Sequence, residues 1–259
     1  MSHRSKLLGA ASAVVFGLVS LTAASAQPLD GFSGMLQGDY ANINSSRGGP
    51  DANVYGVSGS GLFPLGWSGL NFQGDVGYHD YVTSGQNVDN FNFAGDLFWR
   101  MPQGLVGGTV GYDTLNHPDT DITHYGGFGE YYTGPITFAA KGGGFSGDDH
   151  GYYLGGKVQG YATPDFALSG SVDYYKFNRF SNFHETDYTA QGEWLVSETM
   201  PVSVIGGYTY SDLPAGHTST VFAGLRFYIN PVQGDTLVDR QRNGSLDWSK
   251  SFSPTDIAF

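Results

Sequence analysis

The sequence contains no cysteine, so it can form neither a disulfide framework nor a thiolate site. It is also poor in basic residues, with 12 Lys and Arg against 24 Asp and Glu and a formal net charge of −12. Such an acidic chain repels phosphate groups, which argues against nucleic acid as a partner. Beyond residue 27, no apolar run is long enough to cross a membrane as a helix. These absences disfavour a disulfide scaffold, a nucleic-acid binder and a helical membrane protein.

Glycine and aromatic residues, in contrast, are abundant. Glycine accounts for 40 of 259 residues, which is about double its usual share of roughly 7%. Aromatic residues make up 15% of the chain and charged residues only 14%. This composition indicates an all-β protein with unusual surface chemistry.

The first 26 residues are typical of a secretory signal peptide. Arg4 and Lys6 precede an apolar run that closes on the small residues ASA at 24–26. Cleavage is expected before Gln27. The alternative, a membrane-anchoring helix, is disfavoured by the small-residue ending. The mature chain is therefore expected to be exported, and residues 1–26 to take no part in the fold.

Twelve segments with alternating apolar and polar residues follow. Each has about 9 to 13 residues, whereas ordinary strands average about 5 or 6 and tilted membrane-spanning strands need about 9 to 11. Short connections such as PLGW at 64–67 alternate with mostly longer, more polar ones such as NSSRGGPDA at 44–52. Tight turns on one side and longer loops on the other are typical of an outer-membrane barrel. The segments are 32–43, 53–63, 68–81, 89–99, 104–116, 121–133, 135–146, 151–162, 165–177, 186–196, 201–211 and 218–230.

The glycines indicate which face of these segments points outward. Residues such as Gly38 and Gly156 share the apolar face, where they could not fill the core of a soluble barrel. Lipid tails would fill the space beside them. Aromatic residues also gather toward both ends of the segments, Trp99 and Trp194 toward the short connections and Tyr81 toward the long ones, as at two membrane–water interfaces. We therefore expect the apolar face to contact lipid and the polar face to line a lumen.

The last alternating segment carries the most specific signal. Gly224, Phe227 and Ile229 fit the glycine and hydrophobic offsets of a barrel-assembly signal. With these residues, the chain resembles the Gram-negative outer-membrane β-barrel proteins of the small porin-like kind. The resemblance implies an antiparallel up-and-down barrel over residues 27–230 in the cell outer membrane. It also implies recognition by the barrel-assembly machinery and contact with outer-membrane lipids and lipopolysaccharide. Twelve strands fit best, although ten or fourteen are compatible with uncertain strand boundaries.

The chain departs from that pattern at its end, because the assembly signal is followed by residues 231–259. These residues are predicted to be a disordered periplasmic tail. In a second interpretation, Arg240, Arg242, Trp248 and Phe252 dock the tail against the lumen mouth or a periplasmic partner.

Ten charged residues fall on the polar face within the segments and are the candidate functional residues. In one interpretation they form a salt-bridge network that fills a closed structural or surface-interaction barrel. In the other they line a narrow water-filled passage, where seven acids against three bases would favour cations mildly. The ten are Asp39, Asp75, Asp96, Asp113, Glu130, Lys141, Lys157, Asp173, Glu193 and Arg226.

A third function class, a lipid-acting enzyme, would need a nucleophile and a base near the outer rim. His79, His124 and His184 fall there, but no spacing selects a Ser/His/acid set. The loop GDDHG at 147–151 could offer ligands to a divalent cation, but an acidic tight turn in water is the favoured explanation of the same residues. We therefore expect neither catalysis nor a metal or cofactor. A porin-like narrow channel for passive diffusion of small solutes or ions is the favoured function.

Overall fold

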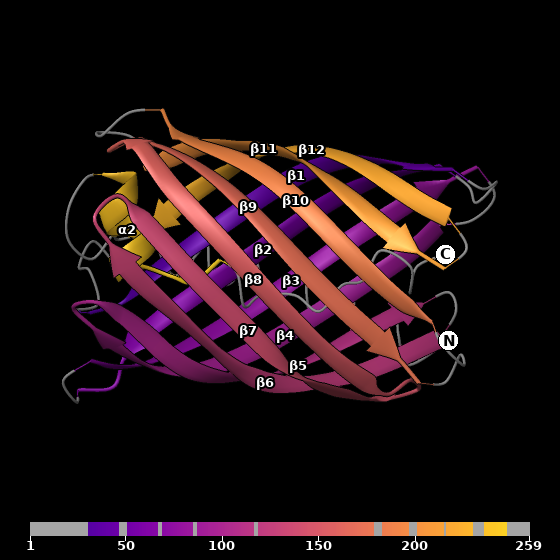
Figure 1. Cartoon of the computed structure of the whole chain (residues 1–259), viewed down its shortest axis with the longest axis horizontal. Coiled ribbons are helices and arrows are strands. Elements are labelled where there is room, and N and C mark those ends of the chain that lie inside the picture. The colour runs from indigo at the N-terminus through magenta and orange to yellow at the C-terminus, as the bar shows by residue number, and fades with distance from the viewer. Residues whose placement is uncertain are drawn as a thin grey trace, which may run out of the picture.

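The computed structural model describes residues 31–46, 51–66, 69–84, 87–116, 119–178, 183–196, 201–214, 216–229 and 236–247. These residues form a closed β-barrel with one short helix (Figure 1). The signal-peptide prediction lies outside the described residues. The strands are β1 (Ser33–Ser45), β2 (Ala52–Pro64), β3 (Leu70–Thr83), β4 (Asn87–Met101), β5 (Gly104–Asn116), β6 (Asp119–Thr133), β7 (Ile136–Gly147), β8 (Gly151–Thr163), β9 (Phe166–Phe177), β10 (His184–Leu195), β11 (Val202–Leu213) and β12 (Gly216–Ile229).

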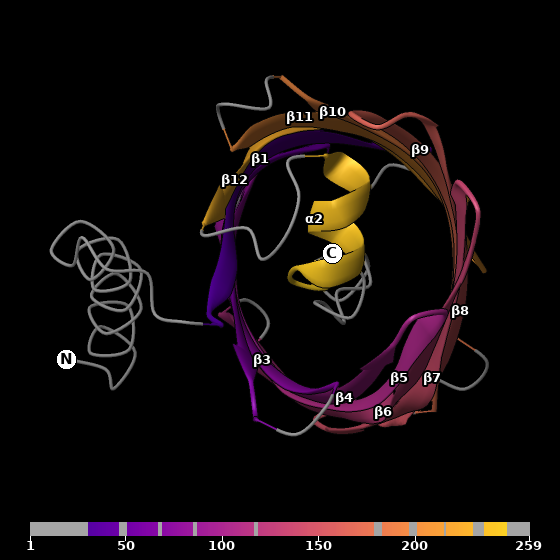
Figure 2. The same ribbon diagram turned by 90° about the vertical axis from the view of Figure 1, so that its left-hand side faces the viewer.

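Each strand pairs antiparallel with the next one in the chain, and β12 pairs with β1 to close the barrel (Figure 2). This confirms the predicted up-and-down barrel of twelve strands; counts of ten and fourteen are wrong. Each predicted segment corresponds to one strand. Several strands extend into residues that were predicted to be loops. For example, β10 begins at His184 and not at residue 186. Their hydrogen-bond ladders continue into residues that look like loop residues from composition alone.

The alternation places two different faces on the barrel. In β12, Arg226 is buried, whereas Leu225 and Phe227 on either side of it are exposed to 46% and 44%. Val221 on the same strand and Val106 and Leu154 on other strands are exposed to 57–58%. These exposed apolar side chains point away from the lumen and are not covered by protein. Lipid is the apolar environment that would cover them.

Glycine on the outer face has the role expected from the sequence. A Cβ atom added at Gly38 or Gly156 would meet no protein atom within 4 Å, so these positions leave open space toward lipid. An inward glycine such as Gly111, in contrast, has no open space beside it. A Cβ at Gly111 would lie 2.3 Å from the His124 ring, so glycine there makes room for a large neighbour. Trp99 and Trp194 are exposed near the tight turns as predicted, whereas Tyr81, expected in the outer aromatic belt, faces the lumen.

The connections at the two ends of the barrel differ less in length than expected, because several strands run on into the predicted loops. One end, called the short-turn end after its predicted turns, carries the connections that join β2 to β3, β4 to β5, β6 to β7, β8 to β9 and β10 to β11, with two to six residues between the strands. Gly134 with φ +52° forms part of one such turn, a backbone conformation that favours glycine. The opposite end, called the long-loop end after its predicted loops, carries the remaining connections, which also have two to six residues.

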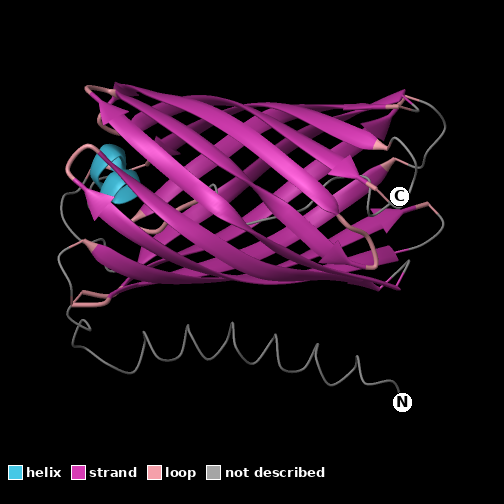
Figure 3. Cartoon of the chain, turned by 60° about the horizontal axis from the view of Figure 1, so that its bottom comes forward, coloured by secondary structure: helices cyan, strands magenta, loops and turns pink. Residues whose placement is uncertain are grey.

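The helix α2 (Leu237–Asn243) lies inside the barrel at the short-turn end (Figures 1 and 3). Thr236 caps it by accepting a hydrogen bond from the Asp239 amide, and Gly244 follows its last residue. The prediction of a disordered tail is therefore wrong for residues 236–247, called the inserted segment below. Specific contacts with the barrel wall, described next, order it. Within the described part of the chain, no helix is long and apolar enough to cross a membrane.

Candidate functional site in the lumen

All ten predicted charged residues face the lumen. Six of them are buried: Asp75, Asp96, Asp113, Asp173, Glu193 and Arg226. The other four, Asp39, Glu130, Lys141 and Lys157, are half-buried. The strand phase explains this result, because each lies on the side of its strand opposite to an exposed apolar row.

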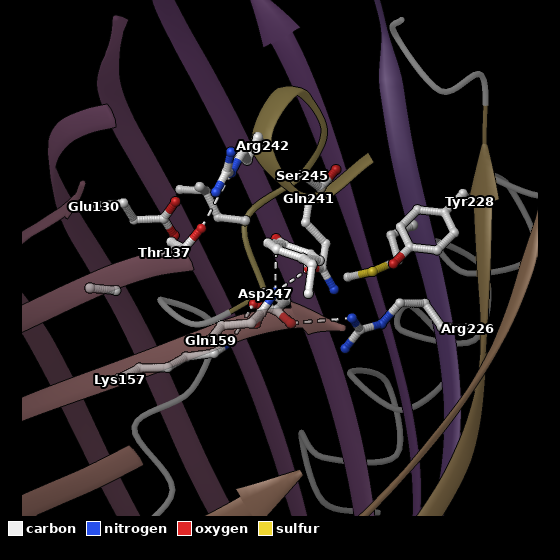
Figure 4. A pocket seen from close by; sticks show the side chains of 14 residues that line it. Glu130, Thr137, Lys157, Gln159, Arg226, Tyr228, Gln241, Arg242, Ser245 and Asp247 are labelled. Atoms are coloured by element: carbon white, nitrogen blue, oxygen red, sulfur yellow. Dashed lines mark hydrogen bonds and ion pairs between the residues drawn. The ribbon is translucent and has the colours of Figure 1, made fainter. Parts of the chain in front are cut away.

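Four charges meet near the short-turn end and form the centre of the site. Arg226 of β12 donates through Nη1 to Glu193 Oε2 of β10 at 2.6 Å. The same nitrogen lies 3.2 Å from Oδ2 of Asp247, which belongs to the inserted segment. The other oxygen of Asp247 accepts from Lys157 Nζ of β8 at 3.3 Å. Figure 4 shows Asp247 between the two cations. Two positive and two negative charges thus form an alternating chain across the lumen, called the charge quartet below.

Glu193 anchors this quartet to the wall. Its Oε1 accepts from Ser203 Oγ at 2.5 Å and from the Tyr228 hydroxyl at 2.6 Å. Its Oε2 also accepts from Gln241 Nε2 of α2 at 2.9 Å. A buried carboxylate surrounded by donors in this way is a strong attachment point, because each charge-assisted hydrogen bond offsets part of its desolvation.

Two arginines fasten the C-terminal end of α2 to the rim. Arg100 of β4 donates to the carbonyls of Asn243 at 2.7 Å and Gly244 at 2.8 Å, where the helix leaves carbonyls unpaired. Arg242 reaches the turn between β6 and β7 and donates to Gly134 O at 2.9 Å and Ile136 O at 3.0 Å. The inserted segment is therefore attached to strands on several sides of the mouth.

Apolar contacts complete the attachment. Leu237 is fully buried in a cluster with Met35, Tyr161, Ala167, Leu195 and Tyr228. Leu246 is buried in a second cluster with Leu62, Phe98, Leu105 and Phe128. The backbone of Leu246 also bonds in both directions with the Gln73 side chain, at 2.7 and 3.0 Å.

Nearer the middle of the lumen, charges form separate local pairs. Lys141 Nζ lies 3.1 Å from Asp173 Oδ1. Asp75 accepts from Ser60 Oγ at 2.6 Å and from Gln73 Nε2 at 3.0 Å. The lumen charges thus form the quartet and local contacts such as that of Lys141 with Asp173, which joins strands two apart and does not cross the lumen as the quartet does.

Open space lies next to the quartet. A cavity of about 200 Å³ is lined by Lys157, Arg226 and Asp247 and by the small polar residues Ser169, Ser171 and Thr189. Beside α2, a second cavity of about 20 Å³, lined partly by Gln241 and Arg242, has room for about one water. The lumen is thus more open in its middle than where the helix sits.

The predicted rim histidines do not gather into one site. His79 faces the lumen, and His124 is buried with Nδ1 2.9 Å from Asp113 Oδ2. His184 lies beside Tyr174, with ring centroids 6.1 Å apart. In the loop at 147–151, Asp148 accepts from the Asp121 amide and Asp149 from the His150 amide, as in an acidic turn. Among the residues that the structure describes, no group of three potential ligands could hold a metal ion.

Solved structures with a similar fold are bacterial outer-membrane proteins. The NanC porin matches with a TM-score of 0.57 and 11% identity over 74% of this chain and 98% of its own. The COG4313 outer membrane channel from Pseudomonas putida F1 matches with a TM-score of 0.55 and 10% identity over 79% and 99% of the two chains. The translocator domain of autotransporter NalP from Neisseria meningitidis follows at 0.52 and 10%, over 85% and 96%. The chain has the fold of an outer-membrane β-barrel.

Sequence comparison adds nothing to this identification. No family model matches the chain, and the search of curated proteins finds no match. In this outer-membrane barrel, β12 is the closing strand, as the expected assembly signal requires. Phe227 points outward, Ile229 ends the strand, and Gly224 packs inward against Asp39. Recognition of these residues by the assembly machinery stays a prediction.

Several lumen residues escaped the sequence analysis. Asp187 has the same strand phase as Glu193 and could have been found by extending the alternation. Arg100 and Glu185 were assigned to connections, although the strands continue through them. Asp247 and Gln241 could not be recognised as lumen residues from the sequence, because the inserted segment lacks the alternation of apolar and polar residues that marks the strands. Of the four proposed docking residues, Arg240 and Arg242 contact the lumen wall, whereas Trp248 and Phe252 lie outside the described residues.

Proposed function

We propose that this protein is a small porin-like channel of the cell outer membrane through which small solutes or ions diffuse passively. The observation that carries the proposal is the cavity of about 200 Å³ in the middle of a lumen lined by charged and hydroxyl side chains. Barrels of eight strands are filled by side chains and those of 16 to 18 carry open channels, so a twelve-stranded barrel can contain a narrow passage. The porin and channel named above have the same kind of fold.

The acidic lumen supports a mild preference for cations. Seven of the ten predicted lumen charges are acids, and Glu185 and Asp187 add two more carboxylates. Carboxylates that line a narrow passage favour the entry of cations over anions.

A closed structural or surface-interaction barrel is the second candidate. The inserted segment supports it, because α2 is attached to strands on several sides of the mouth by hydrogen bonds and apolar contacts. A periplasmic partner that binds residues 231–259 belongs with this candidate. Outer-membrane lipids, lipopolysaccharide and the assembly machinery are expected partners under both.

Enzymatic activity is not part of the proposal. A lipid-acting enzyme would need a nucleophile beside a base, and the described histidines lie on separate strands with aromatic or carboxylate neighbours. Incubation of the folded barrel with phospholipid in detergent is expected to release no product.

Single-channel conductance in a planar bilayer tests the proposal. The mature chain and a form without residues 231–259 are both refolded, and folding is verified by heat-dependent migration in gels. We expect discrete openings that favour cations, larger or more frequent without the tail. Silence from both folded forms would overturn the channel and favour the closed barrel.

A further inference from the structure

The carboxylate of Asp247 occupies a position that a separate solute could occupy. Its two oxygens face two different cations, Lys157 Nζ at 3.3 Å and Arg226 Nη1 at 3.2 Å. These cations belong to β8 and β12, which β9, β10 and β11 separate in the sheet. The carboxylate therefore links two distant parts of the wall from within the lumen. It contributes only its oxygens, as a free carboxylate would.

The barrel wall alone leaves the charge quartet unbalanced. Without Asp247, Lys157 and Arg226 have one carboxylate in direct contact, Glu193, which is held at 2.6 Å by Arg226, while Asp75 on the same cavity is engaged by Ser60 and Gln73. Glu130 interacts with Lys157 only at longer range and has Arg100 as a second cationic neighbour. The side chains of Lys157 and Arg226 are only 12% and 5% exposed. Two poorly solvated cations with one close carboxylate attract a further anion, because an uncompensated charge in a partly dry site is costly.

The surroundings can accommodate the rest of a small molecule. The cavity of about 200 Å³ borders Asp247, Lys157 and Arg226 directly. Its wall offers the hydroxyls of Ser169, Ser171 and Thr189, which can donate to or accept from polar solute groups. The contacts of Asp247 are also longer than the 2.6 Å bond between Arg226 and Glu193, so Asp247 is the more easily exchanged of the two carboxylates.

We propose that Lys157 and Arg226 form a binding subsite for small carboxylate-bearing solutes, and that Asp247 fills it as an internal ligand. A solute carboxylate at this subsite takes the place of Asp247 and loosens the inserted segment. The inference rests on the proposed function, since the solute must enter the lumen. It adds a class of anionic solute that the positive subsite retains against the mild cation preference of the rest of the lumen, and the way in which that solute acts on the segment.

Isothermal titration calorimetry on the full mature chain, refolded in detergent, tests the subsite. The probe is glutarate, and glutaramide is the uncharged control. In the wild type, Asp247 reduces the apparent affinity by occupying the site. We expect Asp247→Ala to bind glutarate about tenfold more tightly than the wild type, since the competitor is gone. Asp239→Ala, which removes the same charge from the same segment away from the cations, is expected to behave as the wild type.

A second substitution locates the binding. Adding Lys157→Gln to Asp247→Ala should abolish the gain. If Asp247→Ala does not fold, Asp247→Asn removes the charge with little change of shape and should show the same order of affinities. Equal binding of glutarate and glutaramide, or no gain over Asp239→Ala, would overturn the subsite.

The calorimetry needs no conduction, so the two proposals can fail separately. Glutarate binding by a barrel that shows no conductance would retain the subsite and remove the channel. Conductance without glutarate binding to Asp247→Ala would retain the channel and remove the subsite.

Discussion

The two ends of the lumen use charge in different ways. At the short-turn end, cations and carboxylates alternate in the quartet, and two of the four belong to distant strands that Asp247 links. At the long-loop end, the inward acids Asp113, Glu185 and Asp187 predominate. Among the inward lysines and arginines of the described strands, Lys141 lies nearest to the long-loop end. Paired charges hold a segment in place, whereas charges of one sign create a field for passing ions.

Under the proposed channel function, this difference separates attachment and ion preference along the barrel axis. The inserted segment contacts the wall where the charges are balanced, and it leaves the acid-rich half of the wall to solutes. Substitutions at one end should therefore change the attachment of the segment with little effect on ion preference, and the reverse should hold at the other end. The predictions below test that separation.

Replacing Arg226 should have the largest effect. Arg226→Met removes the cation shared by Glu193 and Asp247 and leaves Glu193 buried without its partner, which costs about 3–5 kcal/mol. We expect the inserted segment to detach and trypsin to cut after Arg240 and Arg242, sites that the wild type protects. Mass spectrometry of the digest measures the cleavage.

The matched control is Lys176→Met, which removes a cation from β9 without touching the inserted segment. The double variant Arg226→Met/Glu193→Gln separates barrel stability from attachment, because it leaves no buried charge uncompensated. We expect it to restore the melting temperature more fully than the protection from trypsin. Full protection in Arg226→Met would show that the quartet does not hold the segment.

The apolar contacts of α2 should matter next. Leu237→Ala empties part of a fully buried site and should weaken docking of the segment by ~2–5 kcal/mol. The barrel's melting temperature should change little, since Leu237 belongs to the segment. Val238→Ala is the matched control, because Val238 packs against the same cluster but is only partly buried. Equal trypsin cleavage of the two variants would contradict a role for this cluster in attachment.

Replacing Arg100 should weaken the attachment of the inserted segment less than replacing Arg226 or Leu237. Arg100→Gln removes two hydrogen bonds from a cation to the carbonyls that end α2, with an expected cost of about 1.5–3 kcal/mol. The variant should show more frequent channel openings at unchanged ion preference, measured in a planar bilayer. Arg100→Lys, which retains the charge, should give an intermediate frequency. A change in ion preference without a change in opening frequency would contradict the assignment of Arg100 to attachment.

The sequence predicts the wall of the lumen much better than its contents. In a strand, a period of two fixes the direction of every side chain once one face is known, so Asp96 and Arg226 could be placed without coordinates. Arg100 has the phase of Asp96 and was missed only because its strand runs into the expected turn. Asp247 could not be found in this way. Its position depends on tertiary contacts such as the bonds between Gln73 and Leu246, which are 173 residues apart.

Substitutions at the long-loop end should have the smallest effect. They should change ion preference while leaving the attachment of the inserted segment unchanged. Glu185→Gln/Asp187→Asn removes two inward carboxylates, one of which lies directly opposite Asp173 in the register. We expect the reversal potential in a salt gradient to shift toward weaker cation preference by roughly a few millivolts, because solvent ions partly screen the field. Trypsin cleavage of the inserted segment should stay at the wild-type level, because neither residue contacts it.

The shift should shrink in 1 M salt, where the Debye length falls to about 3 Å. A shift that persists in high salt would mean that these carboxylates act through contact with the ion, and a detached segment would mean that the two ends are coupled.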